Sequence, residues 1–260
     1  MTPEFKQTEY RETYQFAKTL LDNPTLAGRN IFIGHWEGDW LLLGEGLGDL
    51  DAPDQGVKGM IDWINLRQQA IEDAKKASPQ SKVNIYHYVE VNRVRDAMVN
   101  GKKRLVDQVL PYVDVDYVSY SAYDVQQDTE ATIHGTLNYI EKKLRPKSNI
   151  PGKRVFIGEF GIGLHGKSRE EQDRLNQKFI GKFLSWGTPY LLYWSLYETR
   201  ANMVPDRKYA LIDEKNQKTP FAITIESFLK RQIDFVKTKA QNGSVNFKEM
   251  MDFVRQEFEK

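Results

Sequence analysis

The chain has 260 residues, of which 40% are hydrophobic and 28% are charged, and its net charge is +1 at neutral pH. A near-neutral chain of this composition is typical of a globular protein with one large or two small domains, and it gives no electrostatic basis for binding nucleic acid or an anionic membrane. The sequence contains no cysteine, which excludes disulfides and thiolate metal sites, and no apolar run approaches the roughly 20 residues of a transmembrane helix.

The N-terminus lacks the apolar segment of a signal peptide. We therefore expect a cytoplasmic protein for the chain as it stands, and a secreted one if the sequence is a fragment or the mature form of a longer precursor. The absence of cysteine is compatible with both compartments.

Apolar periodicity and capping residues predict helices that alternate with strands. Ser168 and Glu171 have the spacing of a capping box, and the basic residues Lys102, Lys103 and Arg104 are expected on a solvent-exposed helix face. A loop rich in glycine and aspartate is expected to cover a cleft. In chain order we predict a helix over 4–22, a strand over 29–34, that loop over 38–56, a helix over 57–77, a strand over 82–88, a helix over 95–112, a strand over 115–121, a helix over 129–144, a strand over 154–158, a helix over 168–186, a strand over 190–196, and helices over 221–240 and 246–259.

The alternation of strands and helices predicts right-handed βαβ units and a parallel sheet. Five strands are found, whereas a closed (β/α)₈ barrel has eight. We therefore expect a partial, TIM-barrel-like α/β fold, in which either three βα units precede Met1 in a longer parent or the sheet is open. Residues 1–245 are assigned to this catalytic-type domain, and residues 246–260 to an amphipathic helix packed on it. An open sheet would leave unpaired edges, so a homodimer is then expected.

Polar side chains gather at the downstream end of every predicted strand. In parallel α/β folds the functional face lies at these carboxyl ends, so such clustering is expected of an active site. The strand ends carry His35, Trp36, Glu37 and Asp39; His87, Glu90 and Asn92; Tyr120, Tyr123 and Asp124; Glu159; and Trp194, Tyr197 and Glu198.

Glu37 and Glu159 are the most informative of these residues. Each comes at the end of a short apolar run, where an ionised side chain is unusual unless it is paired with another group or has a function. Two complete helix-strand units separate them, which suggests a pair of carboxylates facing each other across the mouth of a barrel. Most glycoside hydrolases use such a pair of carboxyl groups to cleave a glycosidic bond.

On these residues the chain resembles the C-terminal five-eighths of a clan-A, cellulase-like glycoside hydrolase, over about residues 4–240. In that clan the acid/base glutamate ends strand four and the nucleophile ends strand seven, so the resemblance implies these roles for Glu37 and Glu159. It also implies that Tyr120 and Tyr123 lie at the end of strand six and that Trp194 lies under the sugar on strand eight. Trp36 stands where the clan usually has asparagine.

The resemblance implies a retaining glycoside hydrolase that acts on a β-linked oligo- or polysaccharide without a cofactor. Glu159 would attack the anomeric carbon, and Glu37 would protonate the leaving oxygen and then activate water. The carbohydrate-contacting residues expected beside these two glutamates are His35, Trp36, Asp39, His87, Tyr120, Tyr123, Asp124, Trp194 and Glu198.

Two alternatives remain open from the sequence. The chain could be a non-catalytic or truncated carbohydrate-binding relic of the barrel. It could instead be a metal-dependent hydrolase that uses His35 and His87 together with Glu159 or Asp124.

Overall fold

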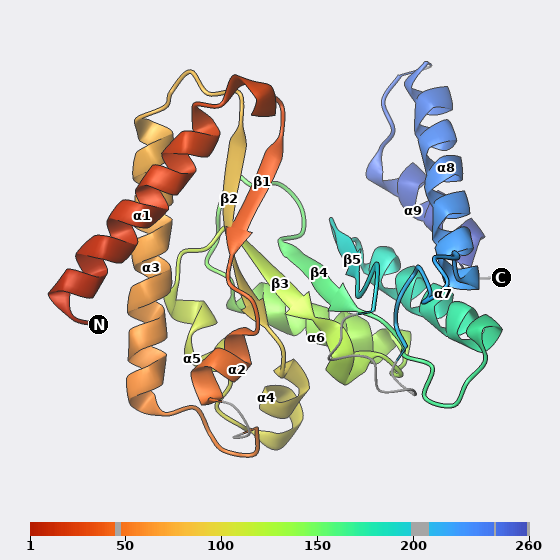
Figure 1. Cartoon of the computed structure of the whole chain (residues 1–260), viewed down its shortest axis with the longest axis horizontal. Helices are drawn as coiled ribbons and strands as arrows, with labels where there is room; N and C mark the ends of the chain where they lie inside the picture. Colours follow the sequence, from red (N-terminus) through yellow and green to blue (C-terminus); the bar gives the residue numbers. More distant parts are fainter. Residues whose placement is uncertain (45–47, 199–207, 242, 259–260) are drawn as a thin grey trace. The chain divides into compact units, whose positions relative to one another are not determined.

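The computed structural model describes residues 1–44, 48–198, 208–241 and 243–258 (Figure 1). Two compact units make up the chain. The first unit comprises Met1–Asp124 and Gly135–Phe156, and the second comprises Val125–His134 and Ile157–Lys260.

The described residues form a five-stranded sheet in the order β1-β2-β3-β4-β5. β1 pairs in parallel with β2 and β2 with β3 in the first unit, while β4 pairs in parallel with β5. β3 meets the start of β4, where the Val118 N–H donates to the Arg154 carbonyl at 2.9 Å. The predicted α/β fold with five strands and a parallel sheet is therefore confirmed. The strands are β1 (Asn30–Gly34), β2 (Asn84–Val91), β3 (Tyr117–Ser121), β4 (Val155–Phe160) and β5 (Leu191–Tyr193).

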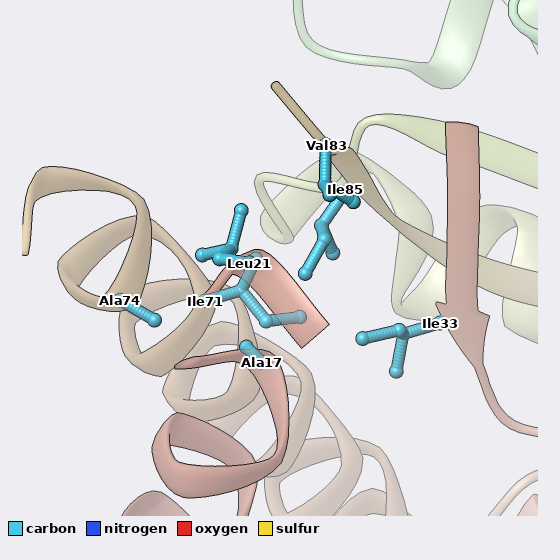
Figure 2. Packing of buried hydrophobic residues seen from close by; sticks show 7 residues of the cluster. All are labelled: Ala17, Leu21, Ile33, Ile71, Ala74, Val83 and Ile85. Carbon is cyan, nitrogen blue, oxygen red and sulfur yellow. The ribbon is translucent and has the colours of Figure 1, made fainter. Parts of the chain in front are cut away.

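Two long helices cover one face of β1 and β2. α1 (Pro3–Leu21) begins at the cap Thr2, whose hydroxyl accepts the Phe5 N–H at 3.2 Å, and it lies beside α3 (Asp54–Lys76) (Figure 1). Figure 2 shows side chains from both helices and both strands meeting in one apolar cluster. This cluster fixes the helix layer on the sheet by removing apolar surface from water. Its buried members are Ala17, Leu21, Ile33, Ile71, Ala74, Val83 and Ile85.

Aromatic rings cover the opposite face of the same strands. Phe32 lies 5.1 Å from Tyr117 between ring centroids, and Tyr86 lies 5.3 Å from Tyr117. Alternate residues of a strand point to opposite faces, which is why Phe32 joins this aromatic group while its neighbour Ile33 joins the helix layer. Gly34 leaves room for the Tyr88 ring, because an added Cβ would lie 2.5 Å from that ring.

Two predicted segments differ from the structure because of contacts made far along the chain. The predicted loop over 38–56 contains α2 (Gly38–Leu43) and the first residues of α3, and its residues 45–47 lie outside the described residues. The predicted helix over 95–112 is broken into α4 (Val94–Asn100), α5 (Leu105–Gln108) and a short 3₁₀ helix, Leu110–Tyr112.

Arg104 explains part of this break. Its predicted place on a solvent-exposed helix face is wrong, since its side chain is fully buried. The guanidinium donates to the carbonyls of Gly48 and Leu50 at 2.7 Å each and pairs with Asp96 at 3.2 Å. Gly101 ends α4 in the left-handed region with φ 64°, so the chain turns before it reaches Arg104.

The second unit is mostly helical around β4 and β5. α7 (Arg169–Trp186) begins at Ser168, whose hydroxyl accepts the Glu171 N–H at 3.1 Å and confirms the predicted cap. α8 (Pro220–Ala240) packs against α9 (Phe247–Phe258) through the rings of Phe228 and Phe258, whose centroids are 4.7 Å apart. α6 (Glu130–Lys143) and β4 both carry the chain from one unit to the other.

Among the described helices, none combines the length and the apolar character that crossing a membrane requires.

Candidate functional site

A cavity of about 310 Å³ lies at the carboxyl ends of β1, β2 and β3, all within the first unit. Carboxyl, amide, hydroxyl, guanidinium and aromatic groups share its wall. This is the edge of the sheet at which parallel α/β folds carry their functional groups. The lining residues are Glu37, Trp40, Asn92, Arg93, Ser121, Tyr123 and Asp124.

Glu37 reaches this cavity from the turn between β1 and α2. Its backbone is in the left-handed region with φ 61° and ψ 46°, which is uncommon for a residue other than glycine. A left-handed residue with a Cβ costs roughly 1–2 kcal/mol. Gly38 follows with no room for a side chain, because an added Cβ would lie 2.1 Å from the Glu90 carbonyl oxygen.

Glu90 is a buried carboxylate that joins the three strand ends. It is only 3% exposed, and its Oε1 accepts the Glu37 N–H at 3.2 Å, the Asn92 amide at 2.9 Å and the Ser121 hydroxyl at 2.8 Å. A typical hydrogen bond inside a protein contributes about 0.5–1.5 kcal/mol net to stability. One side chain therefore ties the turn after β1 to the ends of β2 and β3.

Asp39 is fully buried and does not line the cavity. Its carboxylate accepts the N–H groups of Asn92, Arg93 and Leu105 at 2.9, 3.2 and 2.8 Å. Burial raises the pKa of this carboxyl, and the three N–H groups and the charge of Arg104 oppose that rise. The structure thus gives Asp39 backbone partners rather than an open face for a ligand.

Tyr120 and Asp124 form a hydrogen-bonded pair at the end of β3. Tyr120 is fully buried and its hydroxyl donates to Asp124, whose other oxygen accepts the Arg95 N–H at 2.8 Å. Part of Asp124 is exposed, yet the protein packed around its carboxyl raises the pKa to about 6. The nearby charge of Asp39 adds to the rise. A cavity carboxyl that exchanges its proton this close to neutral pH is a candidate functional group.

Aromatic rings surround the same strand ends. Trp36 is 59% exposed and Tyr123 is 40% exposed, so both offer ring surface to solvent. The Arg93 guanidinium lies over the Trp40 ring, 5.1 Å from its centroid, and pairs with Asp96. Both Trp40 and Arg93 line the cavity.

His35 and His87 face α3 and do not line the cavity. His87 is 1% exposed and its Nδ1 lies 3.0 Å from Gln68 Oε1, while the His35 ring lies 5.4 Å from the Trp63 ring. Burial lowers the pKa of His35 to about 4 and that of His87 to about 3, and the charge of Arg67 lowers both further. Both imidazoles are therefore neutral at physiological pH.

A metal site would need at least three ligating side chains in one place. Among the described residues, no group of three or more histidine, aspartate or glutamate side chains is arranged to hold a metal ion. The buried positions of His35 and His87 against α3 agree with this finding.

The second unit contains the remaining predicted residues. Glu159 lies inside β4 rather than after it and is 9% exposed. Trp194 follows β5, its N–H donates to the Phe160 carbonyl at 2.9 Å, and its peptide bond to Ser195 is cis. Glu198 accepts the Ala210 N–H at 2.7 Å.

Sequence reasoning left four cavity residues out of the predicted site. Asn92 was visible as a polar residue at a strand end, but Trp40, Arg93 and Ser121 gave no comparable signal. Glu90 was also visible at a strand end, since it is a carboxylate in an otherwise apolar strand. Its role depends on the distant residues Glu37 and Ser121, which a local pattern cannot reveal.

Searches against models of known protein families and against curated proteins found no match for this sequence. The resemblance to clan-A glycoside hydrolases therefore remains a prediction.

Proposed function

We propose that this chain is a retaining glycoside hydrolase of the (β/α)₈ type, acting on a β-linked oligo- or polysaccharide. The observation that carries the proposal is the cavity of the first unit, whose lining includes Glu37, Asp124 and Tyr123. Sites for small ligands combine such ring surface with a few convergent polar groups, and their volumes begin at about 300 Å³.

In the proposed reaction the two glutamates have different tasks. The Glu159 carboxylate attacks the anomeric carbon, the glycosidic C–O bond breaks, and the proton of Glu37 passes to the leaving oxygen. Water then attacks the glycosyl-enzyme, Glu37 takes a proton from that water, and Glu159 is released. Retention by this route requires the two carboxyl groups to be about 5–5.5 Å apart.

The cavity also supplies groups suited to sugar hydroxyls and sugar ring faces. Asp124 accepts hydrogen bonds, whereas the buried Asn92 and Ser121 side chains already donate to Glu90. The exposed rings of Trp36 and Tyr123 offer flat apolar surface against which the C–H face of a sugar can pack.

The proposal is tested by assaying the full chain on a panel of aryl β-glycosides and β-linked oligosaccharides. We expect turnover by the wild type, and a loss of at least about 10³-fold in kcat for Glu159→Ala, since the nucleophile is removed. For Glu37→Gln we expect a smaller loss on aryl glycosides whose leaving groups need little protonation. Asp213→Asn, at an exposed turn of the second unit, is the control and should keep wild-type kinetics.

Wild-type turnover that survives Glu159→Ala would contradict the assignment. Binding of the oligosaccharides without any turnover would favour the non-catalytic alternative instead.

A further inference from the structure

We infer that Glu90 is a positioning residue for Glu37, holding the turn from which Glu37 lines the cavity. The kinetic part of this inference rests on the proposed function. The structural part, that the Glu90 carboxylate fixes the Glu37 backbone, stands on the geometry of the first unit alone.

The backbone of Glu37 is in the left-handed region. A non-glycine residue stays in this region only where the surrounding structure fixes it, and such residues gather at functional sites. The Glu37 N–H donates to Glu90 Oε1 at 3.2 Å, and the Glu37 carbonyl accepts the Leu41 N–H of α2 at 2.9 Å. Both the N–H and the carbonyl of Glu37 are therefore held by hydrogen bonds, which restricts the direction of its side chain.

The Glu90 side chain is itself held in place by neighbouring strand ends. Its Oε1 also accepts the Asn92 amide and the Ser121 hydroxyl, from the ends of β2 and β3. Since Glu90 is 3% exposed, its side chain cannot move without breaking these contacts inside the protein. Glu90 therefore fixes the position of the Glu37 turn relative to the ends of β2 and β3.

The two residues that follow Glu37 are also held in place. Gly38 lies against the Glu90 carbonyl, and the fully buried Asp39 is bound by the N–H groups of Asn92, Arg93 and Leu105. The turn is fixed on its downstream side by Asp39 and at Glu37 itself by Glu90. Removal of the Glu90 carboxyl therefore removes the acceptor that holds the Glu37 N–H.

The test compares Glu90→Ala with Glu90→Gln in the full chain. In Glu90→Ala the acceptor is lost, and a misplacement of about 1 Å can lower the rate about 10²-fold, so we expect kcat to fall by about that factor with little change in KM. Glu90→Gln keeps an oxygen where all three donors converge and should recover most of kcat. Hydrogen exchange of the Glu37 amide should be at least about tenfold faster in Glu90→Ala than in wild type.

Asp116→Ala is the matched control. Asp116 is also a buried carboxylate of the first unit that accepts a backbone N–H, that of His87 at 2.9 Å, but it precedes β3 at the opposite end of the strands. We expect this variant to lower the unfolding midpoint while the folded protein keeps the wild-type kcat and the wild-type exchange of the Glu37 amide.

Two results would overturn the inference. One is unchanged exchange of the Glu37 amide in Glu90→Ala, and the other is a loss of kcat that Asp116→Ala reproduces in proportion to its loss of stability. If the wild type cleaves no glycoside, the proposed function fails, and the exchange of the Glu37 amide still decides whether Glu90 positions this turn.

Discussion

Glu37 and Asp39 are separated only by Gly38 and carry the same chemical group, yet the fold gives them opposite surroundings. Glu37 is half-buried and lines the cavity, whereas Asp39 is fully buried and bound by three backbone N–H groups. Leaving a buried donor without its partner costs about 1–3 kcal/mol, so Asp39 contributes to stability through each of these bonds. The difference between the cavity-lining Glu37 and the structural Asp39 therefore lies in the groups that each side chain meets.

The raised pKa of Asp124 can be tested by measuring stability as a function of pH. Its carboxyl has an ordinary pKa of 3.8 and a pKa of about 6 in the folded protein. Between these values the folded state keeps a proton that the unfolded chain has released, so stability contributed by this group falls as the pH rises from about 4 to about 6. Asp124→Asn does not titrate, so the free energy of unfolding of wild type minus that of the variant should decrease across this window and level off above it.

Urea denaturation at several pH values measures this difference. One titrating group changes the free energy of unfolding by at most about 1.4 kcal/mol per pH unit, and the partial exposure of Asp124 lowers that figure. A difference between wild type and Asp124→Asn that stays constant from pH 4 to pH 7 would contradict the raised pKa.

At the scale of elements, the close approach of α2 to β2 determines the shape of the site. In Gly38→Ala the new Cβ would lie 2.1 Å from the Glu90 carbonyl oxygen and 2.8 Å from Leu105 Cδ1. Because backbone atoms cannot yield easily, we expect a loss of about 1–3 kcal/mol in the free energy of unfolding. Gly59→Ala in α3 is the matched control, since nothing lies within 4 Å of its added Cβ.

Gly59→Ala should stabilise the chain by about 0.5–1 kcal/mol, because alanine loses less backbone entropy than glycine in a helix. Chemical denaturation of both variants measures the two effects. Equal stability of Gly38→Ala and wild type would show that α2 and β2 can separate without cost.

The periodicity of apolar residues is sufficient to predict the helices and strands that pack through one apolar face. The helix predicted over 4–22 and the strand predicted over 29–34 correspond to α1 and β1, since an apolar face and an apolar run describe them locally. The helix predicted over 95–112 is interrupted because Arg104 binds the carbonyls of Gly48 and Leu50, a contact that no local pattern contains.

The candidate site was predictable to a similar extent. Glu37, Tyr123 and Asp124 were expected at strand ends, and the structure brings them to one cavity. The same reasoning expected His35 and His87 to contact carbohydrate, but alternate positions of a strand face opposite ways and these two face α3. The predicted sugar contacts of these residues stay untested.

At the scale of the whole molecule, the alternation of strands and helices was enough to predict a parallel α/β sheet. The division into two compact units, with α6 and β4 passing from one to the other, depends on which elements pack together and was not visible in the sequence. Glu37 belongs to the first unit and Glu159 to the second. The homodimer expected for an open sheet stays a prediction that light scattering can test.

The proposed mechanism requires that Glu159 forms a covalent bond to a sugar while Glu37 transfers the proton. The most direct measurement is to incubate the full chain with a panel of 2-deoxy-2-fluoro-β-glycosyl fluorides, which slow the release of a glycosyl-enzyme, and to locate the added mass by peptide mass spectrometry. We expect one sugar attached to Glu159 and none in Glu159→Ala. A sugar attached to another residue, or turnover of β-glycosides that inverts the anomeric carbon, would contradict it.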